Sequence, residues 1–85
     1  MKNIVKVDAI LTRVTAKYNN LPKGGTIRNP KWSYFSYYVG NKVITSENSL
    51  TVNYMSQEGQ HMNIWYVEGK PNRVYRYKIL ALLLG

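Results

Sequence analysis

Short runs of alternating apolar residues, separated by glycine, proline and asparagine, recur along this chain from residue 4 to residue 79. Apolar alternation at period two is typical of strands that bury one face. The turn residues fall at 40–41, 57–60 and 69–72, which leaves intervals that suit one or two strands each. The pattern predicts an all-β domain, with about five or six antiparallel strands in a small barrel or sandwich.

The first run, residues 4–18, changes its alternation part-way. Apolar side chains occupy one parity at Val5, Val7, Ala9 and Leu11, and the other at Val14, Ala16 and Tyr18. One inserted residue moves every later side chain to the opposite face, so the change predicts a β-bulge near residues 11–13. A helix is the alternative, but β-branched residues dominate and capping residues are lacking.

Further strands are expected at 31–39, 42–46, 50–55, 61–67 and 73–79. Gly40-Asn41 is a two-residue hairpin signal, and residues 19–30, with two Pro, two Gly and three Asn, predict a long loop. The predicted core consists of Val5, Val7, Ala9, Leu11, Val14, Phe35, Tyr37, Val39, Val43, Leu50, Val52, Ile64 and Val74.

A chain of 85 residues predicts a single domain over 1–85. It has no cysteine, so no disulfide supports its small core, and eight Tyr, two Trp and one Phe supply large apolar surfaces instead. The lack of cysteine fits a reducing cytoplasm and a cysteine-poor bacterial exterior equally well. Edge strands with apolar faces would allow pairing between chains, but nothing in the sequence indicates an oligomeric state.

Catalytic chemistry finds little support in the sequence. The one histidine, His61, follows a Gly-Gln turn, and the four carboxylates are Asp8, Glu47, Glu58 and Glu68. No nucleophile-elbow pattern is present, and one histidine without cysteine leaves no tetrahedral zinc site. Lys23-Gly24-Gly25-Thr26 lacks the glycine spacing of a phosphate-binding loop. We therefore expect no enzyme activity, metal or cofactor, and keep a small enzyme as the weakest alternative.

Twelve Lys and Arg against four Asp and Glu give a net charge of +8, which attracts phosphate-rich polymers and anionic membranes. Single-strand binders combine a basic groove with aromatic stacking platforms. A single-stranded nucleic-acid-binding barrel is therefore the second hypothesis. Its site would consist of aromatic residues on one strand face with basic residues nearby: Trp32, Tyr34, Tyr38, Lys31, Lys42, Arg73 and Arg76.

The second half of the chain carries a longer pattern. It consists of a Tyr37-Tyr38-Val39-Gly40-Asn41 hairpin, a strand from Gly59 to Tyr66, and a Gly69-Lys70-Pro71-Asn72 turn before the last strand. This pattern resembles the bacterial family of domains of unknown function numbered 3592. It departs from that family in placing Pro71 before Asn72 and in lacking a first membrane helix.

The resemblance implies a small β domain held between membrane helices, extracytoplasmic or juxtamembrane, with no established catalytic residues to carry over. It would make residues 79–85 the start of a membrane helix. Six apolar residues are too few to span a bilayer by themselves, and packing of this tail onto the core is the alternative. Lys70, Arg73, Arg76 and Lys78 precede the tail, which suits anionic head groups but favours the cytoplasmic side.

The leading hypothesis is thus a non-enzymatic, membrane-associated binding or structural module, with an anionic membrane surface or an envelope protein as partner.

Overall fold

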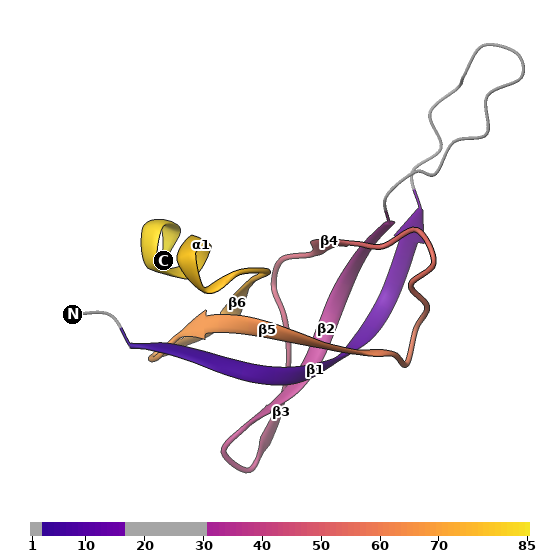
Figure 1. The fold of residues 1–85 in the computed structure, drawn as a ribbon. Helices are drawn as coiled ribbons and strands as arrows, with labels where there is room; N and C mark the ends of the chain where they lie inside the picture. Colours follow the sequence, from indigo (N-terminus) through magenta and orange to yellow (C-terminus); the bar gives the residue numbers. More distant parts are fainter. Residues whose placement is uncertain (1–2, 17–30) are drawn as a thin grey trace, which may run out of the picture.

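The computed structural model describes residues 3–16 and 31–85, whose strands form one antiparallel sheet curled into a half-barrel (Figure 1). The sheet has the order β3-β2-β1-β5-β6, and β4 pairs with β2 beside that path. The elements are β1 (Ile4–Ala16), β2 (Lys31–Val39), β3 (Lys42–Thr45), β4 (Leu50–Val52), β5 (His61–Val67), β6 (Lys70–Tyr75) and α1 (Lys78–Leu84). The all-β prediction is confirmed, while the loop predicted at 19–30 and the strand end at 17–18 lie outside the described residues.

The long strand β1 holds the sheet together because it has two partners. Its first half pairs with β5, from Ile4 opposite Val67 to Ile10 opposite His61. Its second half pairs with β2, and the register shifts by one residue between Thr12 and Thr15. Arg13 lies in this bulge with a φ of +48°, a region that favours glycine. The predicted bulge is confirmed.

The main core fills the inside of the curled sheet. It contains Ala9, Leu11, Phe35, Tyr37, Val52, Ile64, Tyr66 and Val74. The predicted residues Val5, Val7, Val14, Val39 and Leu50 pack against it and are half-buried. Val43 is a wrong prediction, because it is 61% exposed and Ile44 is the β3 residue that packs against the core. Val43 lies opposite Tyr38, also exposed, so the β2–β3 hairpin turns both outward.

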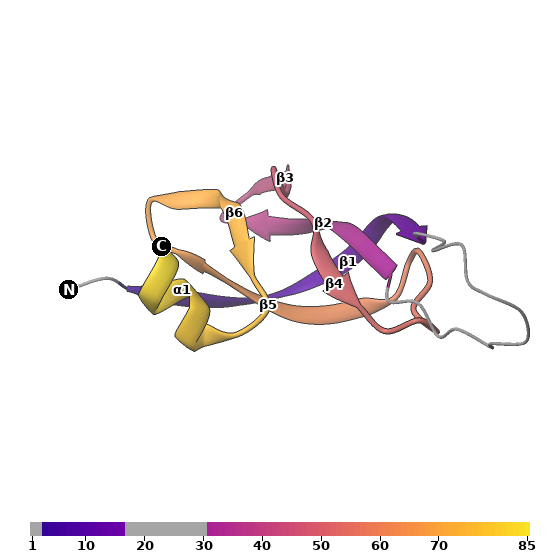
Figure 2. The same cartoon turned by 90° about the horizontal axis from the view of Figure 1, so that it is seen from above.

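A second cluster lies on the other side of the sheet, which we call the outer face. There α1 packs on one end of the sheet (Figures 1 and 2), burying Ala81 against Val67 and Tyr75. Half-buried Ile4, Trp65 and Leu80 complete this cluster. Tyr66, Val67, Tyr75 and Ala81 were missing from the predicted core.

Two predicted strand boundaries are wrong. The last strand is not 73–79 but Lys70–Tyr75, because Gly69, with a φ of +89°, completes the turn early and lets Lys70 pair with Val67. The chain then enters α1 rather than continuing as a strand. The strand predicted at 50–55 ends at Val52, because the Asn53 side chain accepts the Met55 N–H and makes a local turn.

One backbone hydrogen bond and two side chains, rather than a continuous strand ladder, join the open edges of the half-barrel. The backbone N–H of Glu47 donates to the carbonyl of Asn72 at 2.7 Å. Asn48 follows with two hydrogen bonds to the backbone of Val74: its Nδ2 donates to the carbonyl at 2.8 Å, and its Oδ1 accepts from the N–H at 2.9 Å. This side-chain amide therefore stands where a strand residue would pair with β6.

Tyr37 adds to this closure and should make stability depend on pH. Its buried hydroxyl donates to the carbonyl of Pro71. Burial, and then the nearby Tyr66 and Glu47, raise the pKa of Tyr37 from 10.0 to about 12. A raised pKa stabilises the fold fully below pH 10, and this contribution disappears as the pH rises to 12. Two pH units correspond to about 2–3 kcal/mol.

We therefore expect Tyr37→Phe to cost about 1 kcal/mol at neutral pH, through the lost hydrogen bond. It should also flatten the fall in stability between pH 10 and pH 12. Urea unfolding across this range measures both effects. The matched control is Tyr38→Phe, since Tyr38 is 68% exposed and should keep the wild-type slope. Equal slopes for wild type and Tyr37→Phe would contradict the assignment.

Candidate functional site

The solvent side of α1 is apolar, which is unusual for a surface helix. Ala81 faces the sheet and Leu80 is half-buried, yet Ile79 is 62% exposed, Leu83 72% and Leu84 70%. A helix that is apolar on all sides is normally buried in protein or lipid. We call the exposed residues the helix patch: Tyr77, Ile79, Leu82, Leu83 and Leu84. No helix among the described residues has the length and hydropathy to cross a bilayer.

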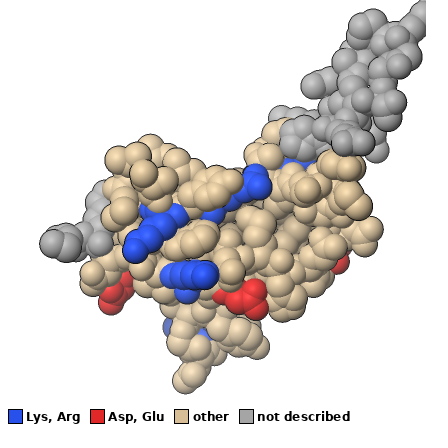
Figure 3. All heavy atoms as spheres, viewed as in Figure 1, with Lys and Arg blue, Asp and Glu red and all other residues tan. Residues whose placement is uncertain are grey.

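Basic residues flank the helix patch. This basic strip consists of Lys70, Arg73, Arg76 and Lys78, from β6, the connection that follows it and the start of α1. Figure 3 shows several Lys and Arg side chains close together on the face below α1. Within residues 3–16 and 31–85, no Lys or Arg forms a salt bridge with an Asp or Glu carboxylate. The positive charge of the strip is therefore not neutralised by an ion pair with an acidic side chain of the described part of the chain.

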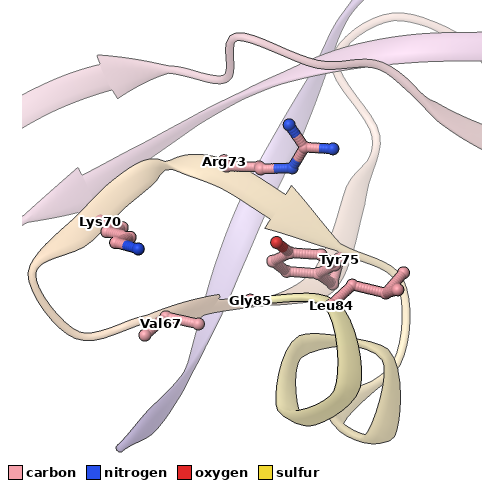
Figure 4. Close-up of a pocket in the computed structure, with 6 residues that line it drawn as sticks. All are labelled: Val67, Lys70, Arg73, Tyr75, Leu84 and Gly85. Atoms are coloured by element: carbon pink, nitrogen blue, oxygen red, sulfur yellow. The ribbon is translucent and has the colours of Figure 1, made fainter. Parts of the chain in front are cut away.

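A cavity of about 320 Å³ lies between the basic strip and α1 (Figure 4). Its lining combines cations with apolar groups: Val67, Lys70, Arg73, Tyr75, Leu84 and Gly85. The Lys70 ammonium and the Tyr75 hydroxyl point toward one another across it. A second hollow borders β6, and its lining includes Glu47 together with Lys70 and Arg73. The first hollow thus places positive charge directly beside the exposed end of the helix patch.

Arg76 is the most constrained member of the strip. Its guanidinium donates to the carbonyl of Thr51 at 2.9 Å and lies 5.6 Å from the centre of the Tyr77 ring. Arg76 therefore connects the start of α1 to β4. Cation–π contact of this kind also keeps the Tyr77 ring close to positive charge.

The structure brings together only some of the seven residues predicted as a nucleic-acid site. Trp32, Tyr34 and Tyr38 share the outer face of β2, as the alternation requires. Arg73 lies on β6, which β1 and β5 separate from β2 along the sheet. Arg76, just after β6, instead donates to the carbonyl of Thr51, the cross-strand partner of Trp32 on β4.

The two predicted lysines also lie apart from the aromatic residues. Lys31 belongs to the opposite parity of β2, and its Nζ donates to the carbonyl of Ser56 at 3.2 Å. Lys42 is exposed at the β2–β3 hairpin, opposite Val39. These two lysines therefore do not share the face of β2 that carries Trp32, Tyr34 and Tyr38.

Trp32 and Tyr34 instead share a cavity with Arg13, which was not among the predicted site residues. Arg13 and Thr15 from β1, Trp32 and Tyr34 from β2, and Ser49 before β4 line a cavity of about 310 Å³, which we call the aromatic cleft. The change of alternation after Leu11 predicts the bulge but gives no sign that the bulged residue borders these rings. Arg13 could not be predicted as a site residue because its position beside the rings depends on the pairing of β1 with β2.

His61 is hydrogen bonded to Asp8, with 3.0 Å between Nδ1 and Oδ2, and both side chains are more than 60% exposed. No serine or threonine hydroxyl of the described residues is hydrogen bonded to His61. The described residues also contain no group of three His, Cys, Asp or Glu able to hold a metal ion.

Comparison of the whole chain with known proteins finds no matching family model, no matching curated protein and no matching solved structure. The family resemblance noted from the sequence therefore stays a prediction.

Proposed function

We propose that this domain is a non-enzymatic module that binds anionic membrane surfaces through the helix patch and the basic strip. The observation that carries the proposal is the position of Leu84, at the exposed end of the helix patch, in one cavity with Lys70 and Arg73, neither of which forms a salt bridge with an acidic side chain of the described residues. Helices that lie in a membrane interface combine an apolar face with Lys and Arg at its border. The occupant that matches both properties is a bilayer containing anionic lipids.

The two parts of the surface contribute in different ways. Each Lys or Arg near an anionic bilayer contributes about 1 kcal/mol, and salt weakens this contribution. Burial of the exposed aliphatic side chains adds about 25 cal/mol per Å² of apolar surface, and it depends little on salt. Tyr77, at the start of α1, suits the head-group level, where aromatic residues with polar ends are enriched. The net charge of +8 strengthens the attraction.

The test is flotation of the purified chain with vesicles of phosphatidylcholine, with and without phosphatidylglycerol. We expect binding to the anionic vesicles only, and weaker binding as salt is added. The double variant Ile79→Asp/Leu83→Asp should lose at least about tenfold in affinity, equivalent to 1.4 kcal/mol, because buried carboxylates oppose insertion. Both positions are exposed, so the fold should be kept.

The control adds one carboxylate, half the charge change of the double variant, at a different exposed position. Val43 is 61% exposed on β3, and Val43→Asp should bind vesicles nearly as well as wild type. If Val43→Asp and the double variant lose affinity equally, the helix patch is not the binding surface. If wild type ignores anionic vesicles at low salt, the proposed function is wrong.

A further inference from the structure

A second surface, on the outer face and away from α1, has the chemistry of a ligand site. We propose that the aromatic cleft binds one nucleotide unit, with the base against Trp32 and Tyr34 and the phosphate at Arg13. The cleft takes side chains from three segments that are distant in sequence: β1, β2 and the connection before β4. Its volume of about 310 Å³ is at the small end of the range for ligand sites, which limits it to one such unit.

The backbone of Arg13 has an unusual conformation that supports a ligand site. A φ of +48° costs an arginine free energy that glycine or asparagine would largely avoid. Strained residues of this kind are concentrated at ligand and active sites. Here the bulge brings a guanidinium to the border of a cavity lined by two aromatic rings. A side chain able to form two parallel hydrogen bonds to a phosphate thus occupies the strained position.

The residues that lie opposite Trp32 and Tyr34 in the sheet are small and leave space beside the two rings. The cross-strand partners of Trp32 are Thr15 on β1 and Thr51 on β4, and the partner of Tyr34 is Thr12. Threonines are small beside an indole, so they leave room above the sheet at the place where the cavity lies. Thr15 and Ser49 also bring hydroxyls to the cleft, which can hydrogen bond to a base or a sugar.

A guanidinium beside two aromatic rings favours a ligand that is planar, aromatic and negatively charged. Every nucleobase can stack on Trp or Tyr, and this contact is independent of sequence. Residues i and i+2 on a strand lie about 7 Å apart, so Trp32 and Tyr34 are spaced along β2 as successive platforms. The nucleotide could be free or part of a single strand, and the experiment separates these sources.

The experiment titrates the chain with a fluorescent oligothymidylate at low salt, then repeats the titration with unlabelled adenosine monophosphate as competitor. Arg13→Gly removes the charge while keeping a backbone that suits a positive φ. Tyr34→Leu removes the stacking face and keeps an apolar side chain. Each should weaken oligonucleotide binding about tenfold, as expected for one phosphate contact or one stacked base. Lys42→Ala is the matched control, since it removes one exposed charge from the β2–β3 hairpin, which belongs neither to the cleft nor to the basic strip.

The results separate the aromatic cleft from the helix patch, which lie apart on the outer face. Loss with Arg13→Gly and Tyr34→Leu, but not with Lys42→Ala, supports the cleft, and competition by the mononucleotide identifies a single-nucleotide site rather than a strand. Equal loss with Lys42→Ala, or no binding, overturns the proposal. Vesicle flotation of Arg13→Gly should match wild type, so failure at the cleft leaves the membrane proposal untouched, and the reverse also holds.

Discussion

Replacing Phe35 with alanine should cost this domain about 3–5 kcal/mol of unfolding free energy, the range expected when a buried aromatic ring is removed. Phe35 has no solvent exposure and lies at the centre of β2, opposite Leu11 on β1. Small domains are stable by only about 5–15 kcal/mol, so the variant should be unfolded in part even without denaturant. Urea unfolding followed by tryptophan fluorescence measures the loss.

The matched control for Phe35 is on the same strand. Tyr38→Ala removes an aromatic ring that is 68% exposed, and it should cost less than about 1 kcal/mol. Comparable losses at the two positions would mean that the inside of the curled sheet is not the main core.

Replacing Asn48 with alanine should cost about 2–4 kcal/mol. The substitution removes both hydrogen bonds between this side chain and the backbone of Val74, a residue with no solvent exposure. A buried donor or acceptor left without a partner costs about 1–3 kcal/mol, and here one of each is affected. Because these bonds join the connection before β4 to β6, amide hydrogen exchange should also become faster at Val74.

An asparagine with no such role provides the comparison. Asn63 is exposed on β5, and Asn63→Ala should change stability by less than about 0.5 kcal/mol. If Asn48→Ala is equally mild, water replaces its hydrogen bonds and the side chain does not close the half-barrel.

Local patterns were enough to predict the strands but not their neighbours. The bounds of β2 and β5 follow from alternation between clear turns, and the bulge in β1 follows from the change of parity. The early start of β6 depends on a turn at Gly69 that shortens the connection and includes Pro71 in the strand. Val43 and Ile44 are similar residues in adjacent positions, and only the register against β2 decides which one is buried.

The candidate sites depend on strand order, which this sequence does not specify. Trp32, Tyr34 and Tyr38 share a face by alternation alone, but whether Arg73 lies beside them depends on which strands intervene. Arg13 reaches the rings only because β1 pairs with β2 after its bulge. The apolar run that forms α1 is visible in the sequence. The side of α1 that packs on the sheet is the side of Ala81, the one small residue of the helix.

If the helix patch is the surface that enters the bilayer, a fluorescent probe placed on that patch should report it directly. The chain contains no cysteine, so Leu83→Cys and Val43→Cys can each carry one environment-sensitive fluorophore. On addition of anionic vesicles, the probe at residue 83 should shift to the blue as it leaves water, while the probe at residue 43 should not change. Vesicle binding with no shift at residue 83, or with an equal shift at residue 43, would contradict the account.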